Sequence, residues 1–169
     1  MTVEQNLDSV ELEIREAIRA LAEQQNWRSN REWTAAVIRT VCELGERLGF
    51  EPCAKGRKSH VGQGEWLYDA VWLHFGDEHH VTDVQLILES EWSPDLKDIE
   101  DDFLKLLVGR AAHRVMIFEQ ARSDELNGKF DHLQDQIKHF SQTRVGDRYL
   151  LLGFAREGIV RFSSRLIVT

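Results

Sequence analysis

The sequence has little proline and cysteine, only two of each in 169 residues, and no apolar run that approaches the length of a membrane span. The two cysteines, Cys42 and Cys53, are isolated and have no CxxC partner, and Cys42 in a predicted helix is expected to be a reduced, buried thiol. The acidic first 16 residues lack the basic-then-apolar order of a secretory signal. We therefore expect a cytoplasmic protein with no membrane segment.

Basic residues are also scarce: 21 Lys and Arg stand against 29 Asp and Glu, which gives a formal net charge of −8. A domain that mainly coats nucleic acid should be basic, because neutralising phosphates drives such binding. The balance therefore argues against a simple DNA-binding module, and less against a nuclease, which concentrates acidic groups around metal ions. No GxxxxGKS loop, GxGxxG turn or GxSxG elbow is present, so nucleotide-cofactor enzymes and serine hydrolases of that type have no support.

The spacing of apolar residues is helical in the N-terminal third and becomes extended in the middle of the chain. Capping pairs at Asp8 and Ser29, and the pair Ser93-Pro94, predict helix starts. The predicted elements are helices at residues 8–24, 29–48, 93–110 and 130–140, at most a short strand within 50–64, and strands at 65–75, 81–92, 113–119, 149–156 and 159–168.

These elements predict one domain over residues 1–169, with N-terminal helices at 1–49, a core at 50–119 and a closing helix and strands at 120–169. The strand–helix–strand step from 81 to 119 implies a parallel crossover, whereas the hairpin before it implies antiparallel pairing. The expected fold is therefore α/β, with a mixed sheet that has helices on both faces.

Carboxylates on two of the predicted strands are the candidate functional residues. Alternation along 65–75 places Asp69 on the same face as large apolar residues, where an unpaired charge costs several kcal/mol. Glu89 and Glu91 share one face of the next strand, so their charges repel unless a cation lies between them. If the strands pair, three carboxylates converge on a site suited to Mg²⁺.

A structural role is the competing interpretation. Asp69 can bond a neighbouring backbone or an arginine, and Glu89 and Glu91 can lie at an exposed strand end. The histidine-rich turn at 74–80 has no zinc-ligand spacing and is better explained as a solvated hairpin tip.

The order helix, glycine-bearing loop, Asp-bearing strand, strand with Glu-x-Glu, helix and strand resembles the PD-(D/E)xK superfamily of restriction enzymes and repair nucleases, over residues 33–119. The resemblance implies a restriction-endonuclease-like fold and an Mg²⁺ or Mn²⁺ site, with Asp69 and Glu89 as metal ligands. Glu91 stands where the family has a lysine, and some members carry Glu-x-Glu there. Others move a motif residue onto the following helix, which makes Lys105 the candidate for a migrated lysine.

The position of Lys105 on its predicted helix leaves two alternatives. It lies nearly opposite Leu96, yet Leu104 and Val108 make that part of the helix apolar almost all round. Lys105 therefore either belongs to the site or is a solvated lysine. Glu43 or Glu46 on the second helix could add a further acidic group.

The resulting hypothesis is a metal-dependent phosphodiesterase, a DNA endonuclease-like protein in which Asp69, Glu89, Glu91 and Lys105 form the catalytic set. The resemblance implies DNA as partner and, because many members work as dimers, a homodimer. The alternative is a nuclease-like domain without catalysis that acts as a binding or regulatory module in a bacterial-type cytoplasm. A protein that imitates DNA would explain the charge but not the apolar placement of Asp69.

Overall fold

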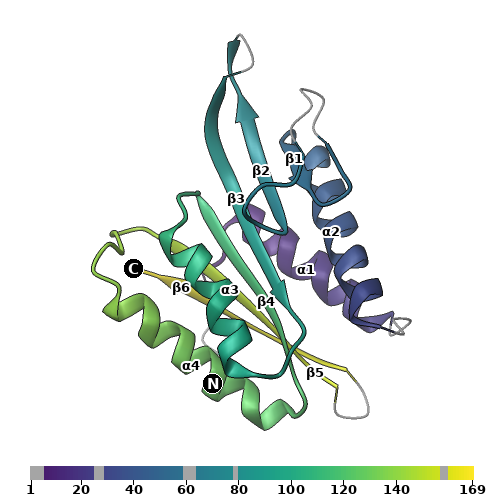
Figure 1. Cartoon of the computed structure of the whole chain (residues 1–169), viewed down its shortest axis with the longest axis vertical. Helices are drawn as coiled ribbons and strands as arrows, with labels where there is room; N and C mark the ends of the chain where they lie inside the picture. The colour runs from purple at the N-terminus through teal and green to yellow at the C-terminus, as the bar shows by residue number, and fades with distance from the viewer. Residues whose placement is uncertain (1–5, 25–28, 59–63, 78–79, 157–159) are drawn as a thin grey trace.

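A six-stranded mixed β-sheet runs through the molecule and has helices on both faces (Figure 1). The structure is a computed structural model and describes residues 6–24, 29–58, 64–77, 80–156 and 160–169. The predicted α/β class with a mixed sheet is confirmed. The described residues form α1 (Ser9–Glu23), α2 (Asn30–Arg47), β1 (Glu51–Ala54), β2 (Ala70–Phe75), β3 (Val81–Glu91), α3 (Leu96–Val108), β4 (His113–Gln120), α4 (Ser123–His139), β5 (Arg148–Ala155) and β6 (Arg161–Val168).

The strands lie across the sheet in chain order, from β1 to β6. β1, β2 and β3 are antiparallel neighbours, β3, β4 and β5 are parallel, and β6 returns antiparallel to β5. The predicted hairpin is closed by a hydrogen bond of 2.9 Å from Gly76 N to His80 O, and residues 78–79 of its turn lie outside the described residues. α3 connects the parallel strands β3 and β4, so the predicted crossover is confirmed.

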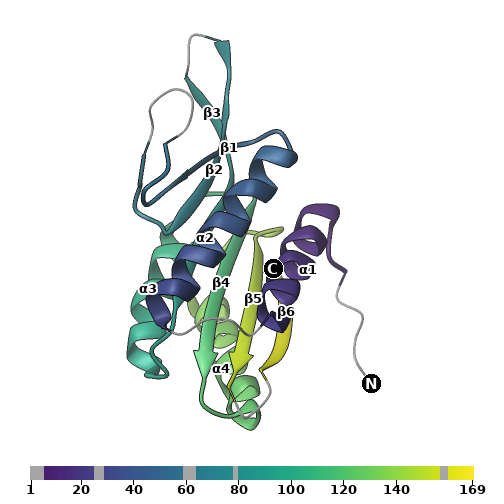
Figure 2. The ribbon, with the colours of Figure 1, turned by 90° about the vertical axis from the view of Figure 1, so that its right-hand side faces the viewer.

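Alternate residues of the strands enter two cores, one on each face of the sheet. Leu86 and Leu88 of β3 pack in the core that α1 and α2 cover, whereas Ile87 packs in the core that α3 and α4 cover. Figure 2 shows α1 and α3 on opposite sides of the sheet. The period of two along β3 therefore directs Glu89 and Glu91 to the side of α3.

The first two helices begin where the sequence predicts. Asp8 accepts a hydrogen bond from the backbone of Glu11, and the side chain of Glu11 reaches back to the backbone of Asp8, which completes a capping box. Ser29 caps α2 by accepting from the backbone of Glu32 at 3.3 Å. After α2, Gly49 has a φ of 87°, a left-handed conformation that glycine adopts without strain.

The predicted strand at 65–75 is wrong in its first half, because β2 begins only at Ala70. Residues 67–69 form a bend, so Asp69 lies just before the strand rather than within it. The pairing explains the difference. Ala54 ends β1 opposite Ala70, so the preceding residues have no neighbouring strand on that side.

Two helix starts are also corrected. α3 is capped by Asp95, whose side chain accepts from Lys97 N at 2.9 Å, whereas the predicted cap Ser93 accepts from Asp95 N at 3.2 Å and holds the preceding turn. α4 begins at Ser123, seven residues before the predicted start at 130, and has no side-chain cap. Leu126, buried against the sheet, holds this early part of the helix despite Gly128.

Both cysteines are free and fully buried, as predicted for Cys42. Burial is the main reason that the pKa of Cys42 is raised to about 11, so the thiol stays protonated at neutral pH. Among the described residues, no helix combines the length and apolar character that crossing a membrane requires.

Candidate active site

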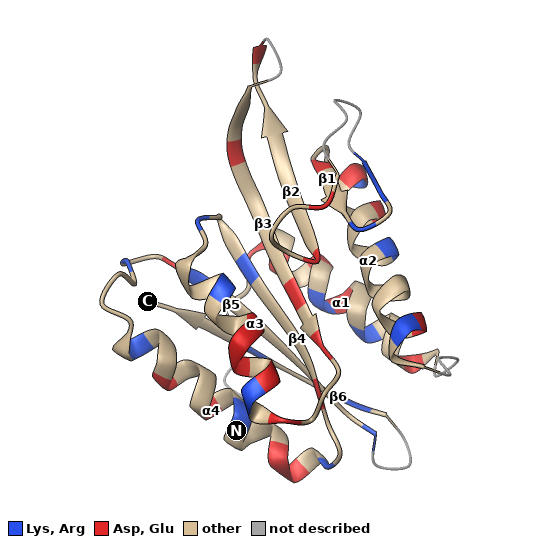
Figure 3. Cartoon of the chain, viewed as in Figure 1, with Lys and Arg blue, Asp and Glu red and all other residues tan. Residues whose placement is uncertain are grey.

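Asp69 and Glu89 lie beside each other at the ends of two paired strands. Ala70 is opposite Leu88 in the antiparallel pairing of β2 with β3, so Asp69, which directly precedes β2, is brought next to Glu89 of β3. The charge of Asp69 is one of the causes that raise the pKa of Glu89. Acidic positions thus gather on this stretch of β3 and on the facing helix α3 (Figure 3).

Hydrogen bonds to Ser90 hold the carboxylate of Asp69 in place. Its Oδ2 accepts from Ser90 N at 2.9 Å and from Ser90 Oγ at 2.7 Å. These bonds fix the bend that the sequence pattern did not predict. They leave Oδ1 without a hydrogen bond in the part of the chain that the structure describes, so one oxygen of Asp69 remains available to a ligand.

Glu89 is the most unusual ionisable group of this region, because its side chain is only 2% exposed. Burial, and then the charge of Asp69, raise the pKa of Glu89 to about 8, although Lys105 opposes the shift. Its Oε1 is buried without a hydrogen bond among the described residues and lies 3.2 Å from Lys105 Nζ. A buried carboxyl with so little compensation favours binding of a further cation.

Lys105 reaches this pair from α3. Its Nζ lies 3.2 Å from Glu89 Oε1 and 2.7 Å from Asp102 Oδ1, while 44% of the side chain remains exposed. Burial lowers its pKa, but the hydrogen bond with Asp102 and the charge of Glu89 outweigh burial, and the net shift is upward. Lys105 is therefore protonated at neutral pH, and the geometry places it with Glu89 while its head group still contacts solvent.

Glu91 is held differently from the other two predicted carboxylates. It is half-buried, and its Oε1 accepts from Ser93 N at 2.6 Å in the turn that leads to α3. Two residues of strand separate it from Glu89 by about 6.6 Å. Asp69, Glu89 and Glu91 do not bring three ligand oxygens within 4.8 Å of one another, so the predicted convergence of three carboxylates is not found. Asp69 and Glu89 remain neighbours through the pairing of β2 with β3.

Tyr68 and Asp102 are neighbours of the site that the sequence did not assign to it. The hydroxyl of Tyr68 donates to the carbonyl of Lys105 at 3.4 Å, and burial, followed by the charge of Glu89, raises the pKa of Tyr68. Tyr68 thereby packs against α3. Glu43 and Glu46 are exposed on α2, and Glu46 pairs with Arg57 rather than with the site.

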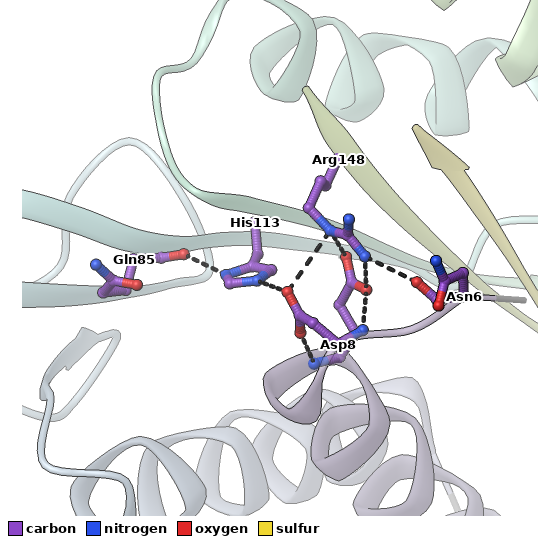
Figure 4. Close-up of polar contacts among 6 residues, drawn as sticks. Asn6, Asp8, Gln85, His113 and Arg148 are labelled. Atoms are coloured by element: carbon purple, nitrogen blue, oxygen red, sulfur yellow. Dashed lines mark hydrogen bonds and ion pairs between the residues drawn. The ribbon is translucent and has the colours of Figure 1, made fainter. Parts of the chain in front are cut away.

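A second polar cluster joins the N-terminus of α1 to the starts of β4 and β5 (Figure 4). His113 Nε2 lies 2.8 Å from Asp8 Oδ2, and His113 Nδ1 lies 3.0 Å from Gln85 O. Asp8, Glu11 and His113 place one ligand atom each within 4.8 Å of one another, so this cluster could hold a metal ion. No pattern in the sequence indicated this cluster, because His113 and Asp8 are 105 residues apart.

The existing contacts of the second cluster already compensate its charges. Arg148 Nε and Nη2 donate to the two carboxylate oxygens of Glu11 at 2.7 and 2.6 Å, and Glu11 is fully buried. Burial raises the pKa of Asp8, but its hydrogen bonds to Glu11 and His113 and nearby positive charges leave the pKa lowered overall. A cation bound here would have to compete with Arg148.

The two candidate cation sites differ in how far their carboxylate oxygens are already bonded to other groups. Comparison with known proteins gives no independent guide to the choice. No protein-family model, curated protein or solved structure matches this chain. On geometry alone, the Asp69–Glu89 pair has a free carboxylate oxygen and a buried oxygen without a hydrogen bond, whereas Asp8 and Glu11 are bonded to His113, Arg148 and the backbone.

Proposed function

We propose that the chain is a metal-dependent phosphodiesterase of the PD-(D/E)xK type that acts on DNA, with Asp69 and Glu89 as ligands for Mg²⁺ or Mn²⁺. The observation that carries the proposal is the buried carboxyl of Glu89 beside Asp69, whose Oε1 is approached by the half-exposed Lys105 and has no hydrogen bond from the backbone among the described residues. Hard divalent cations prefer such oxygen ligands, and a bound cation would relieve both the burial of Glu89 and its repulsion from Asp69.

The order of the elements around the pair supports the same family. After α2 and a loop, two antiparallel strands, a crossover helix and a parallel strand follow in the order that the resemblance implies. Asp69 directly precedes the second strand, and Glu89 lies near the end of the third. Lys105 reaches the pair from the helix that follows, which fits the role of a migrated lysine.

A bound cation and the side chains around it would each have a separate role in the reaction. A divalent cation held there lowers the pKa of water and neutralises charge on a phosphate. Asp69 is oriented for binding by Ser90, through Oδ2, and presents Oδ1. Lys105 stays protonated, so it stabilises negative charge on the phosphate and does not act as a base. Glu91 keeps Oε1 on Ser93 N, and its second oxygen would complete the metal shell or position the attacking water.

One observation favours the alternative, a binding or regulatory module without catalysis. Lys105, Glu89 and Asp102 already form an ion cluster in which a cationic side chain lies against the buried carboxyl. With Glu91 in place of a strand lysine, such a cluster could keep the scaffold neutral without a metal.

Cleavage of supercoiled plasmid DNA with Mg²⁺ or Mn²⁺ tests the proposal. Wild type should nick the plasmid, and Asp69→Asn and Glu89→Gln should each slow it by more than about 100-fold, since even outer-shell changes at metal sites cost 10–100-fold. Glu43→Gln, an exposed glutamate of α2, serves as the matched control and should cleave like wild type. Cleavage at the wild-type rate in both site variants would refute the assignment.

A further inference from the structure

A groove of about 590 Å³ lies between the first half of α2 and the loop after β1. Four of its lining residues are cationic, namely Arg31, Arg39, Lys55 and Arg57, and none of the described residues that line it is a carboxylate. Figure 3 shows basic positions on α2 and on that loop. In a chain whose net charge is −8, such a concentration of positive charge is a local departure from the average.

Two contacts place this groove beside the candidate active site. Ala54 is opposite Ala70 at the ends of β1 and β2, so Lys55 and Asp69 occupy the next position of each strand. On the other side, Trp92 Nε1 donates to Thr34 Oγ1 at 2.8 Å, and Trp92 directly follows Glu91 in the sequence. The groove therefore approaches the strand ends at Asp69 and Glu91 from the α2 side of the sheet, whereas Glu89 faces α3.

Most of the positive charge in the groove is uncompensated. Arg57 pairs with Glu46, but the side chains of Arg31, Arg39 and Lys55 have no ion pair or hydrogen bond within the described ranges. Like charges gathered around one groove repel one another, and a bound anionic ligand would offset this electrostatic repulsion. Arg31 and Arg39 are eight residues apart on α2, about 12 Å along the helix axis.

That span exceeds what a single phosphate requires. Successive phosphates of one DNA strand rise about 3.4 Å along the duplex, so 12 Å corresponds to several of them. We propose that the groove binds the sugar–phosphate backbone of the DNA strand next to the phosphate held at Asp69 and Glu89. This inference rests on the proposed function and specifies how the substrate is gripped, without reading its base sequence.

Fluorescence anisotropy with a labelled 20-base-pair DNA duplex in EDTA tests the groove without any cleavage. The groove variant Arg39→Glu/Lys55→Glu should lose at least about tenfold in affinity, and its plot of log affinity against log salt should flatten by about 0.9 for each lost phosphate contact. The control Arg144→Glu/Arg161→Glu changes the net charge equally at two exposed arginines outside the groove and should bind within about threefold of wild type. The milder pair Arg39→Gln/Lys55→Gln repeats the test without introduced carboxylates.

Each outcome separates the groove from the catalytic proposal. Equal losses in the groove and control pairs, or no duplex binding by wild type, would overturn the groove. Loss confined to the groove variants supports it even if wild type never cleaves plasmid with Mg²⁺ or Mn²⁺, a result that would refute only the phosphodiesterase. Cleavage that needs Asp69 but is unchanged in both groove variants would refute only the groove.

Discussion

Replacing Glu89 by glutamine in the metal-free protein should change how stability depends on pH. The pKa of this carboxyl, ordinarily 4.5, is raised to about 8 in the folded protein by burial and then by the charge of Asp69. Between these values the folded state binds more protons than the unfolded state, so stability is present at low pH and is lost as pH rises. Each pH unit within this interval lowers the free energy of unfolding by about 1.4 kcal/mol, and the whole interval lowers it by on the order of 5 kcal/mol.

Glutamine keeps the shape of the side chain but cannot ionise, so Glu89→Gln should escape this loss. In EDTA, urea unfolding at pH 5.5 and pH 8.5 should show the variant gaining on wild type by about 3 kcal/mol between the two conditions. Glu43→Gln, on an exposed part of α2, should show no such gain. If the difference in free energy of unfolding between Glu89→Gln and wild type were the same at both pH values, the raised pKa of Glu89 would be refuted.

Two further predictions concern packing around the sites. Arg148→Met should lower the free energy of unfolding by about 3 kcal/mol in urea titrations, because it leaves the fully buried Glu11 unpaired. Adding Glu11→Gln should recover part of that loss, and a further loss would contradict the ion-pair argument. Gly109→Ala should destabilise by about 1–3 kcal/mol, because its Cβ would lie 2.4 Å from both Tyr68 Oη and Ile87 Cδ1. In the control Gly128→Ala, in α4, the added Cβ would have nothing within 4 Å, so this change should raise the free energy of unfolding by about 0.5–1 kcal/mol. Equal thermal midpoints for the two variants would contradict the close approach at Gly109.

Local signals in the sequence predicted most of the fold. The caps at Asp8 and Ser29 depend on residues three positions away, so they could be recognised without knowing the tertiary structure. The start of α4 could not, because no side chain caps it and buried Leu126 holds its first turns against the sheet. The bend at Asp69 depends on hydrogen bonds with Ser90, 21 residues later, and a contact between residues so far apart in the sequence has no local signal.

Strand pairing and the alternation of side chains along a strand predicted part of the candidate site. A hairpin register brings Asp69 to Glu89, and a period of two places Glu91 on the same face. The sequence could not decide between two roles for Lys105, because its approach to Glu89 depends on how α3 packs on the sheet. Nor could it decide what Glu91 would bond, since Ser93 N lies in the turn whose shape was not predicted.

The most direct test of the account is the position of Mn²⁺ in anomalous difference maps of crystals grown with that ion. The account predicts a peak in coordinating contact with Asp69 Oδ1 and the carboxylate of Glu89, next to Lys105. A peak enclosed by Asp8, Glu11 and His113, with no density between Asp69 and Glu89, would contradict it.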